Sequence, residues 1–87
     1  MAHQQDEILD QYIDLVRYLA SSLLPEEVDF TVEAEFTRDQ VLLKLYVPEE
    51  HRGRVIGKGG RIARAMRTLA SSAAIPNHLP VSIDIVD

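Results

Sequence analysis

The sequence predicts an α+β domain with the element order α-β-β-α-α-β, in which a three-stranded mixed sheet carries three helices on one face. Three observations predict this class: a long helical periodicity near the start of the chain, two alternating runs that can form a hairpin, and a final alternating run reached through two short helices. A strand, two helices and another strand make a crossover connection, so the last two strands should be parallel.

The first element is a helix over residues 6–22. Its apolar residues recur at helical spacing and form one face: Ile8, Tyr12, Leu15, Val16, Leu19 and Leu23. Leu9 and Ile13 widen this face to nearly half of the circumference, and Pro25 ends the helix. Residues 1–5 precede the pattern, so we expect a disordered lead there and a single domain over residues 6–87.

Two strands with one buried face follow the helix. Apolar and polar residues alternate over residues 28–37 and again over residues 41–47. A tight turn at Arg38-Asp39 gives a register that places every apolar residue on one side and a charge pair on the other. In this register Phe36 lies opposite Val41, Ala34 opposite Leu43 and Glu33 opposite Lys44.

Two short helices and a third strand complete the predicted order. Pro48 followed by two glutamates indicates the start of the second helix, which ends at Gly57. The third helix begins near Gly60, with Ile62, Met66, Leu69, Ala70 and Ala73 on its apolar face and Arg61, Arg64, Arg67 and Thr68 opposite. Residues 76–80 are predicted as a loop, and residues 81–85 alternate as a last strand.

The composition excludes several kinds of protein and site. A chain of 87 residues has room for one core, and the absence of cysteine excludes a disulfide framework and thiolate metal sites. His3, His51 and His78 lack metal-ligand spacing, and no serine or carboxylate has a catalytic partner, so we expect no metal, no cofactor and no enzymatic activity. No apolar run is long enough to span a bilayer and no signal peptide is visible, so we expect a cytoplasmic protein without a membrane partner.

Basic charge is concentrated in one segment of an acidic chain. The net charge is −5, yet six of the nine lysines and arginines lie between Arg52 and Arg67, where no acid occurs. The net charge alone would argue against a nucleic-acid partner, whereas this distribution favours a local contact with a polyanion.

The basic segment contains the stretch VIGKGGR at residues 55–61. A glycine-rich turn that leads into a helix exposes N–H groups suited to phosphate. A P-loop would need Ser or Thr after Lys58, where Gly59 stands, and a dinucleotide-binding fingerprint would need its third glycine where Ile62 stands. Two readings remain: a G-x-x-G loop between two short helices, or a plain helix connector without a ligand.

The sequence Val-Ile-Gly-Lys-Gly-Gly between two short helices resembles the G-x-x-G loop of a K-homology (KH) domain, and the element order resembles its bacterial type II form. The flanking sequence RVIGKGGRIARAMRTLASSAA resembles the single-KH RNA-binding proteins of the KhpA type, and the resemblance covers roughly residues 7–87. It implies a non-catalytic protein that binds single-stranded RNA as a post-transcriptional regulator or RNA chaperone. It also implies a homodimer and pairing with a larger KH-containing partner.

The resemblance assigns the RNA site to the loop and its flanks. RNA phosphates would meet the backbone of Gly57, Lys58, Gly59 and Gly60, with charge added by Lys58 and Arg61. Arg64 would follow the RNA backbone further, and Val55 and Ile56 would line an apolar groove for bases, unless one of the two is plain core.

Two residues depart from the family pattern. Arg52 stands where an apolar residue is usual, and Gly59 makes the loop more flexible. The alternative function is a KH-fold module that docks a protein, with RNA binding incidental. Tyr18 on the polar side of the first helix, beside Leu9, Ile13 and Leu24, is a candidate for part of a dimer contact.

Overall fold

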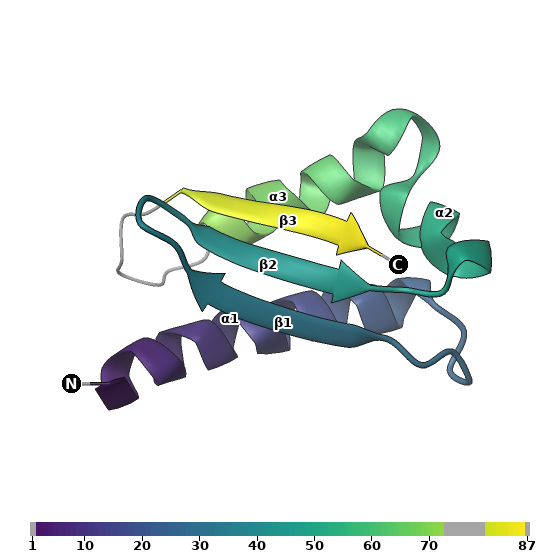
Figure 1. Cartoon of the computed structure of the whole chain (residues 1–87). Helices are drawn as coiled ribbons and strands as arrows, with labels where there is room; N and C mark the ends of the chain where they lie inside the picture. Colours follow the sequence, from purple (N-terminus) through teal and green to yellow (C-terminus); the bar gives the residue numbers. More distant parts are fainter. Residues whose placement is uncertain (1, 73–79, 87) are drawn as a thin grey trace.

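The strands and helices follow the predicted order. The computed structural model describes the backbone of residues 2–72 and 80–86 and the side chains of residues 7–72 and 80–86. Its elements are α1 (Ala2–Leu23), β1 (Thr31–Phe36), β2 (Val41–Tyr46), α2 (Arg52–Ile56), α3 (Arg61–Ser72) and β3 (Val81–Val86), with single 3-10 turns at Glu49–His51 and Lys58–Gly60. Helices α1 and α3 lie on the same face of the sheet (Figure 1). The predicted α+β class is therefore confirmed, while Ala73 and residues 76–79 lie outside the described residues.

Helix α1 is longer than the periodicity predicts. It begins at Ala2 rather than near residue 6, so residues 2–5, expected to be a disordered lead, have helical backbone. Alanine and glutamine are good helix formers, and no glycine or proline interrupts the first turn. The apolar pattern gave no sign of this turn because residues 2–5 add no large apolar residue to the helical periodicity.

The β1–β2 hairpin has the predicted register. Phe36 pairs with Val41, Ala34 with Leu43 and Glu33 with Lys44 in an antiparallel ladder. At the turn the Thr37 amide donates to the Gln40 carbonyl at 2.8 Å, and the Thr37 hydroxyl accepts from the Gln40 amide at 3.1 Å. The Ser82 hydroxyl donates to Gln40 Oε1 at 2.6 Å, which joins the turn to β3.

The charge pair predicted between Glu33 and Lys44 forms differently. Lys44 makes its ion pair with Glu35, at 3.7 Å between Nζ and Oε1, although Glu33 is its direct cross-strand partner. Glu33 instead accepts a hydrogen bond from the Tyr46 hydroxyl. In both contacts the β2 residue reaches a β1 residue that lies two positions beyond its direct partner. Strand twist brings such diagonal neighbours within reach of long side chains.

The core lies between the sheet and its helical cover. Strand β2 is central, antiparallel to β1 and parallel to β3 as predicted, and its inward residues Val41, Leu43 and Leu45 are fully buried. They meet α1 and α3 residues that are buried at helical spacing: Tyr12, Val16, Ala20, Met66 and Ala70. The core therefore fixes how α2 and the start of α3 leave the sheet.

Two helical details correct the sequence predictions. The segment after Pro48 is a 3-10 turn at Glu49–His51 followed by α2, rather than one helix. Leu69, assigned to the apolar face of α3, is 51% exposed, whereas Met66 and Ala70 on the same face are buried. A further correction concerns Leu24, which was named with Tyr18 as part of a candidate dimer contact and is instead buried in the core.

Candidate nucleic-acid interface

The glycine loop joins α2 to α3 through an unusual backbone path. Gly57, Gly59 and Gly60 all have positive φ, at 76°, 65° and 78°. The Gly57 amide donates to the Gly53 carbonyl at 2.9 Å and ends α2, and the Gly60 amide donates to the Gly57 carbonyl at 3.1 Å. L-residues with side chains rarely adopt such φ values, so this path depends on glycine.

Gly57 is required by packing as well as by its φ. A Cβ at this position would lie 2.6 Å from Cγ1 of Ile62, which is closer than carbon atoms approach one another. Ile62 is the second residue of α3 and packs against the core. Gly57 therefore lets the two helices approach, which a side chain at this position would prevent.

Gly59 has open space above its backbone. Within the described residues, no heavy atom beyond its chain neighbours lies within 4 Å of the position that a Cβ would take. Gly59 also lies at the exposed crest of the loop, next to the exposed side chain of Lys58. A ligand can thus reach the main chain here without meeting a side chain.

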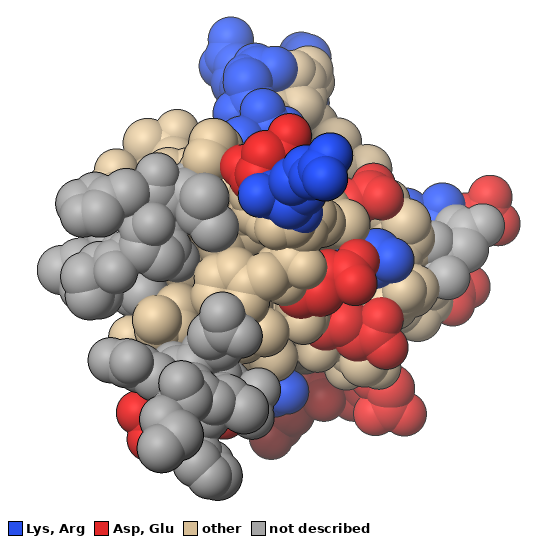
Figure 2. Space-filling model, turned by 60° about the vertical axis from the view of Figure 1, so that its left-hand side comes forward, with Lys and Arg blue, Asp and Glu red and all other residues tan. Residues whose placement is uncertain are grey.

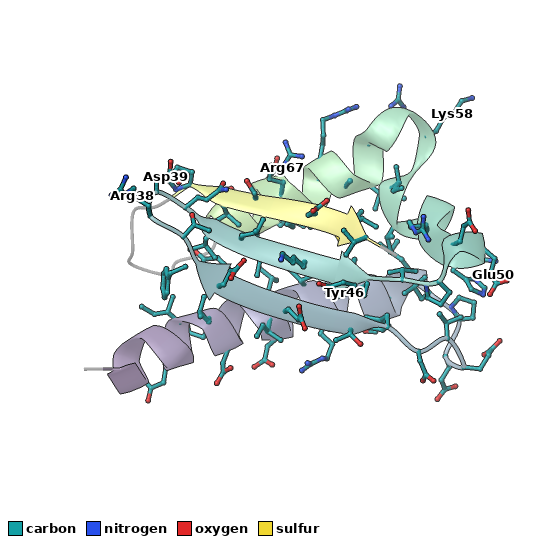
Figure 3. The ribbon with its side chains drawn as sticks, viewed as in Figure 1. Arg38, Asp39, Tyr46, Glu50, Lys58 and Arg67 are labelled. Carbon is teal, nitrogen blue, oxygen red and sulfur yellow. The ribbon has the colours of Figure 1, made fainter. Side chains whose placement is uncertain are left out.

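Positive charge gathers around this loop. The side chains of Lys58, Arg61 and Arg64 are exposed, and Lys58 points away from the body of the domain (Figure 3). Lysine and arginine atoms project at the top of the molecule, whereas below them acidic atoms and other lysine and arginine atoms lie side by side (Figure 2). Basic charge without acidic neighbours is therefore confined to one end of this view.

The two apolar residues before the loop have different environments. Val55 is fully buried in the core, whereas Ile56 is 36% exposed. Of the pair predicted to line an apolar groove, Ile56 thus has a partly exposed side chain, whereas Val55 belongs to the core. The sequence left this choice open because both residues are β-branched and adjacent.

Arg64 lies against the loop. Its Nη1 donates to the Gly59 carbonyl oxygen at 2.8 Å, across five residues. The resemblance implied that Arg64 follows the RNA backbone beyond Arg61, but a contact between a guanidinium and a carbonyl leaves no mark in a sequence pattern.

Arg52 explains one departure from the family pattern. Its Nε donates to the Val47 carbonyl at 3.3 Å and thereby joins the start of α2 to the end of β2. The arginine that replaces a usual apolar residue thus has a partner within the fold. The sequence did not predict this contact, because a hydrogen bond from a guanidinium to a backbone carbonyl leaves no pattern in the sequence.

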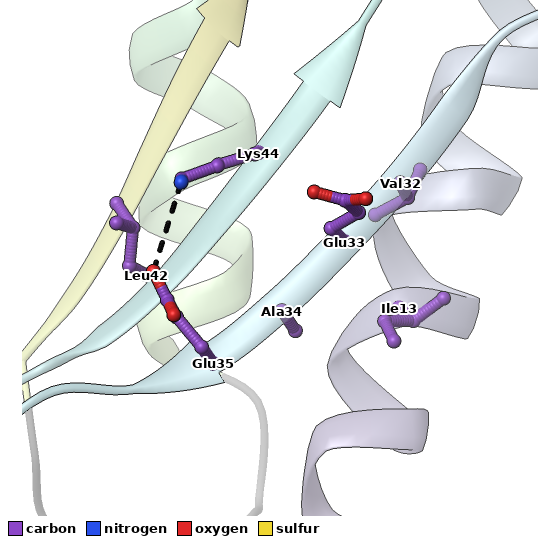
Figure 4. A pocket seen from close by; sticks show the side chains of 7 residues that line it. All are labelled: Ile13, Val32, Glu33, Ala34, Glu35, Leu42 and Lys44. Carbon is purple, nitrogen blue, oxygen red and sulfur yellow. Dashed lines mark ion pairs between the residues drawn. The ribbon is translucent and has the colours of Figure 1, made fainter.

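A hollow lies over β1 and β2, beside α1. It has a volume of about 400 Å³ and is lined by Ile13, Val32, Glu33, Ala34, Glu35, Leu42 and Lys44. Figure 4 shows the Lys44–Glu35 ion pair across β1 and β2, with Ile13 on α1 beside the other edge of β1. Hydrogen bonding to the Glu33 carboxylate raises the pKa of the nearby Tyr46 hydroxyl. The acidic rim of this hollow does not suit an anionic ligand.

The described residues offer neither a metal-binding cluster nor a membrane-spanning helix. No group of three or more His, Asp or Glu residues suited to a metal ion occurs among the described residues. Within the same ranges no helix is long and apolar enough to cross a membrane.

Comparison with known proteins gives one consistent result. The family model "KhpA/KhpB, KH domain" matches residues 13–85. The RNA-binding protein KhpA of Clostridium perfringens is 38% identical over 73 residues, which cover 84% of this chain and 97% of that protein. The RNA-binding proteins KhpA of Treponema pallidum and Bacillus subtilis are 38% and 34% identical, over 85% and 90% of this chain and 92% and 98% of their own lengths.

No solved structure gives a significant match. The relatives nevertheless agree with the resemblance read from the glycine loop and the element order, and the family is one of RNA-binding KH proteins rather than of enzymes. This chain belongs to the KhpA/KhpB family of KH domains.

Proposed function

We propose that this protein binds single-stranded RNA without catalysis, through the loop of Gly57–Gly60, and acts in the cytoplasm as a post-transcriptional regulator or RNA chaperone. The observation that carries the proposal is the open backbone at Gly59 beside two exposed cations, Lys58 and Arg61. The names of the relatives, RNA-binding protein KhpA, support the same class of ligand.

The phosphate contacts follow from this geometry. Backbone N–H groups at the crest of the loop and the charges of Lys58 and Arg61 act on the same phosphates, because a KH module clamps about four nucleotides through its loop. Charge-assisted hydrogen bonds of this kind are roughly twice as strong as neutral ones. The acidic remainder of the surface repels RNA and favours approach at this end of the molecule.

In this proposal an RNA base packs on the side chain of Ile56. Its partly exposed side chain lies directly before Gly57 and offers an apolar surface on which a base can lie. Val55 acts beneath it in the core. One apolar contact and a few phosphates give weak affinity for a single domain, so two copies on one RNA would bind it more tightly.

An NMR titration with a short unlabelled single-stranded RNA tests the site. The proposal expects amide shifts at residues 56–61, with Leu42 and Tyr46 on the outer sheet face unchanged. Shifts confined to the sheet face, or none at millimolar RNA, would contradict it.

A second candidate function, docking of a protein, is favoured by a separate observation. An apolar hollow of about 290 Å³ lies between α1 and α3 and is lined mainly by Leu19, Leu23, Ile62, Met66 and Leu69. The exposed Tyr18 lies directly before this stretch of α1. A second copy of the chain or a larger KH-containing protein would cover this surface.

Purification of the tagged protein from cell lysate, with and without RNase, separates the two functions. A partner that remains after RNase treatment is held by protein contacts and favours docking. A partner that is lost with the RNA favours the RNA-binding proposal.

A further inference from the structure

We propose that Arg64 is a positioning residue for the glycine loop: its guanidinium holds the Gly59–Gly60 peptide in the orientation that presents the Lys58 and Gly59 amides to a phosphate. This inference rests on the proposed function for its consequence, but the contact itself belongs to the protein without RNA. The direct phosphate role expected for Arg64 is thereby replaced by an indirect one.

The contact is short and well directed. The Arg64 Nη1–Gly59 oxygen distance of 2.8 Å is typical of a charge-assisted hydrogen bond. The same nitrogen lies 3.3 Å from the position that a Cβ on Gly60 would take, so the guanidinium rests against the loop backbone. An arginine that faced only solvent would make neither approach.

The Gly59–Gly60 peptide is consequently fixed at both ends. Its carbonyl accepts from Arg64, and its amide donates to the Gly57 carbonyl at 3.1 Å. The next amide, of Arg61, donates to the Lys58 carbonyl. Among the hydrogen bonds of the described residues, none uses the amide of Lys58 or that of Gly59, so these two donors remain for an anion.

The loop needs such a restraint because of its composition. Gly59 has φ 65° and ψ 18° and no packing neighbour above it. Glycine loses more conformational freedom on ordering than any other residue, and an unrestrained loop would lose that freedom when RNA binds. A loop ordered beforehand binds more tightly because this entropic cost has already been met in folding.

Arg67 supplies the matched control. It lies on the same helix, is exposed and carries the same charge, but the described structure gives it no hydrogen bond to the loop. Arg64→Ala and Arg67→Ala therefore remove equal charge from α3, and only the first removes the contact with Gly59.

The first measurement uses the protein without RNA. Backbone ¹⁵N relaxation should show the order parameters of Gly59 and Gly60 falling from about 0.85 to below about 0.6 in Arg64→Ala, with no change in Arg67→Ala. Equal order at Gly59 in both variants would overturn the proposal. Because no RNA is present, this result stands whether or not the loop proves to be an RNA site.

The second measurement separates positioning from direct phosphate contact. Arg64→Ala should weaken RNA binding by about 3- to 10-fold, as expected for one net hydrogen bond, and leave the salt slope close to that of the native chain. Loss of a direct phosphate ligand would instead reduce the slope by about 0.7, as we expect for Lys58→Ala. A slope reduced by that amount in Arg64→Ala, with the loop still ordered, would overturn the proposal.

A rescue variant tests loop order without any change in charge. Asparagine tolerates positive φ, and a side chain at Gly59 meets no neighbour, so Gly59→Asn restricts the loop by another route. In the Arg64→Ala background Gly59→Asn should recover order at Gly60 in the protein without RNA. Order at Gly60 that stays as low as in Arg64→Ala alone would count against the proposal.

Failure of the proposed function would look different from failure of this inference. If Lys58→Asp with Gly59→Asp leaves RNA binding intact, the loop is not the RNA site. The relaxation data then still decide whether Arg64 orders the loop.

Discussion

At the scale of single residues, the glycines of one loop serve different purposes. Gly57 lets Ile62 approach the backbone, Gly59 leaves the main chain open, and Gly60 turns the chain into α3. The first purpose concerns stability and the second concerns access for a ligand. Substitutions should therefore separate them.

Alanine at Gly57 and at Gly59 should have unequal effects on stability. Gly57→Ala adds a Cβ 2.6 Å from Ile62 at φ 76°, and should lower the free energy of unfolding by about 2–4 kcal/mol. Gly59→Ala meets only the cost of positive φ, about 1 kcal/mol. Urea unfolding followed by circular dichroism measures both, and equal losses would contradict the packing role of Gly57.

Val55 and Ile56 provide a second test at this scale. Val55→Ala removes a fully buried side chain and should lower the free energy of unfolding by about 1.5–3 kcal/mol. Ile56→Ala removes a partly exposed one and should cost less than about 1 kcal/mol. RNA affinity measured on the folded proteins should fall in Ile56→Ala; the reverse assignment of stability and affinity would show that Val55 meets the base.

The sequence predicted residues 55–60 as one unit, but it did not predict which of Val55 and Ile56 is buried. The motif identified residues 55–60 as a unit, because glycine spacing and flanking charge are local features. Which of two adjacent apolar residues is buried depends on the angle at which α2 leaves the sheet. That angle is fixed by the core and by contacts such as that of Arg52 with Val47, which no local pattern encodes.

At the scale of elements, the β1–β2 hairpin was predictable and its charge contacts were not. Alternation fixed the register because a slip of one residue would turn every apolar side chain outward. Long side chains on the outer face are free of that constraint and follow the twist of the sheet. Lys44 thus meets Glu35, and Tyr46 meets Glu33.

The pairing of Tyr46 with Glu33 predicts an alkaline transition on this face. Because the pKa of Tyr46 in the folded protein lies above its ordinary value of 10.0, the contact stabilises the fold fully below pH 10 and loses its effect as the pH rises through the folded-state pKa. Glu33→Gln removes the carboxylate charge and should lower the pKa of Tyr46. Ultraviolet titration of tyrosinate, with Tyr46→Phe to assign the transition, measures the change.

The Glu33→Gln variant also serves as a control for RNA binding. The outer sheet face lies away from the glycine loop, so Glu33→Gln should leave RNA affinity unaltered at neutral pH. An unchanged tyrosinate transition in Glu33→Gln would contradict the contact between Glu33 and Tyr46.

At the scale of the whole molecule, the concentration of lysine and arginine around the glycine loop explains how a protein of negative net charge can bind RNA. The net charge of −5 opposes RNA binding at long range, and the cations around the loop favour it at short range. A positive local potential within a Debye length of about 10 Å at moderate salt then selects the orientation in which RNA arrives.

The salt dependence of binding should accordingly be shallow. Single-stranded RNA gives a slope of about −0.7 per neutralised phosphate, so two to four contacts predict a slope of about −1.4 to −2.8 in a plot of log K against log salt concentration. Fluorescence anisotropy over a range of salt concentrations measures it. A slope near zero would contradict an electrostatic contact at the loop.

RNA binding at the glycine loop is best tested by fluorescence anisotropy at low salt with three proteins. They are the native chain, Lys58→Asp with Gly59→Asp, and a charge-matched control, Arg38→Asp with Gln11→Glu. All four positions are exposed, and Arg38 lies at the end of the sheet opposite Lys58 (Figure 3). Circular dichroism confirms that each variant is folded.

The loop variant should bind RNA about tenfold or more weakly, since it loses a cation and places two carboxylates where phosphates lie. The control, with the same change in net charge, should bind nearly as the native chain does. Equal binding by the native chain and the loop variant, or equal losses in the two variants, would contradict an RNA site at the glycine loop.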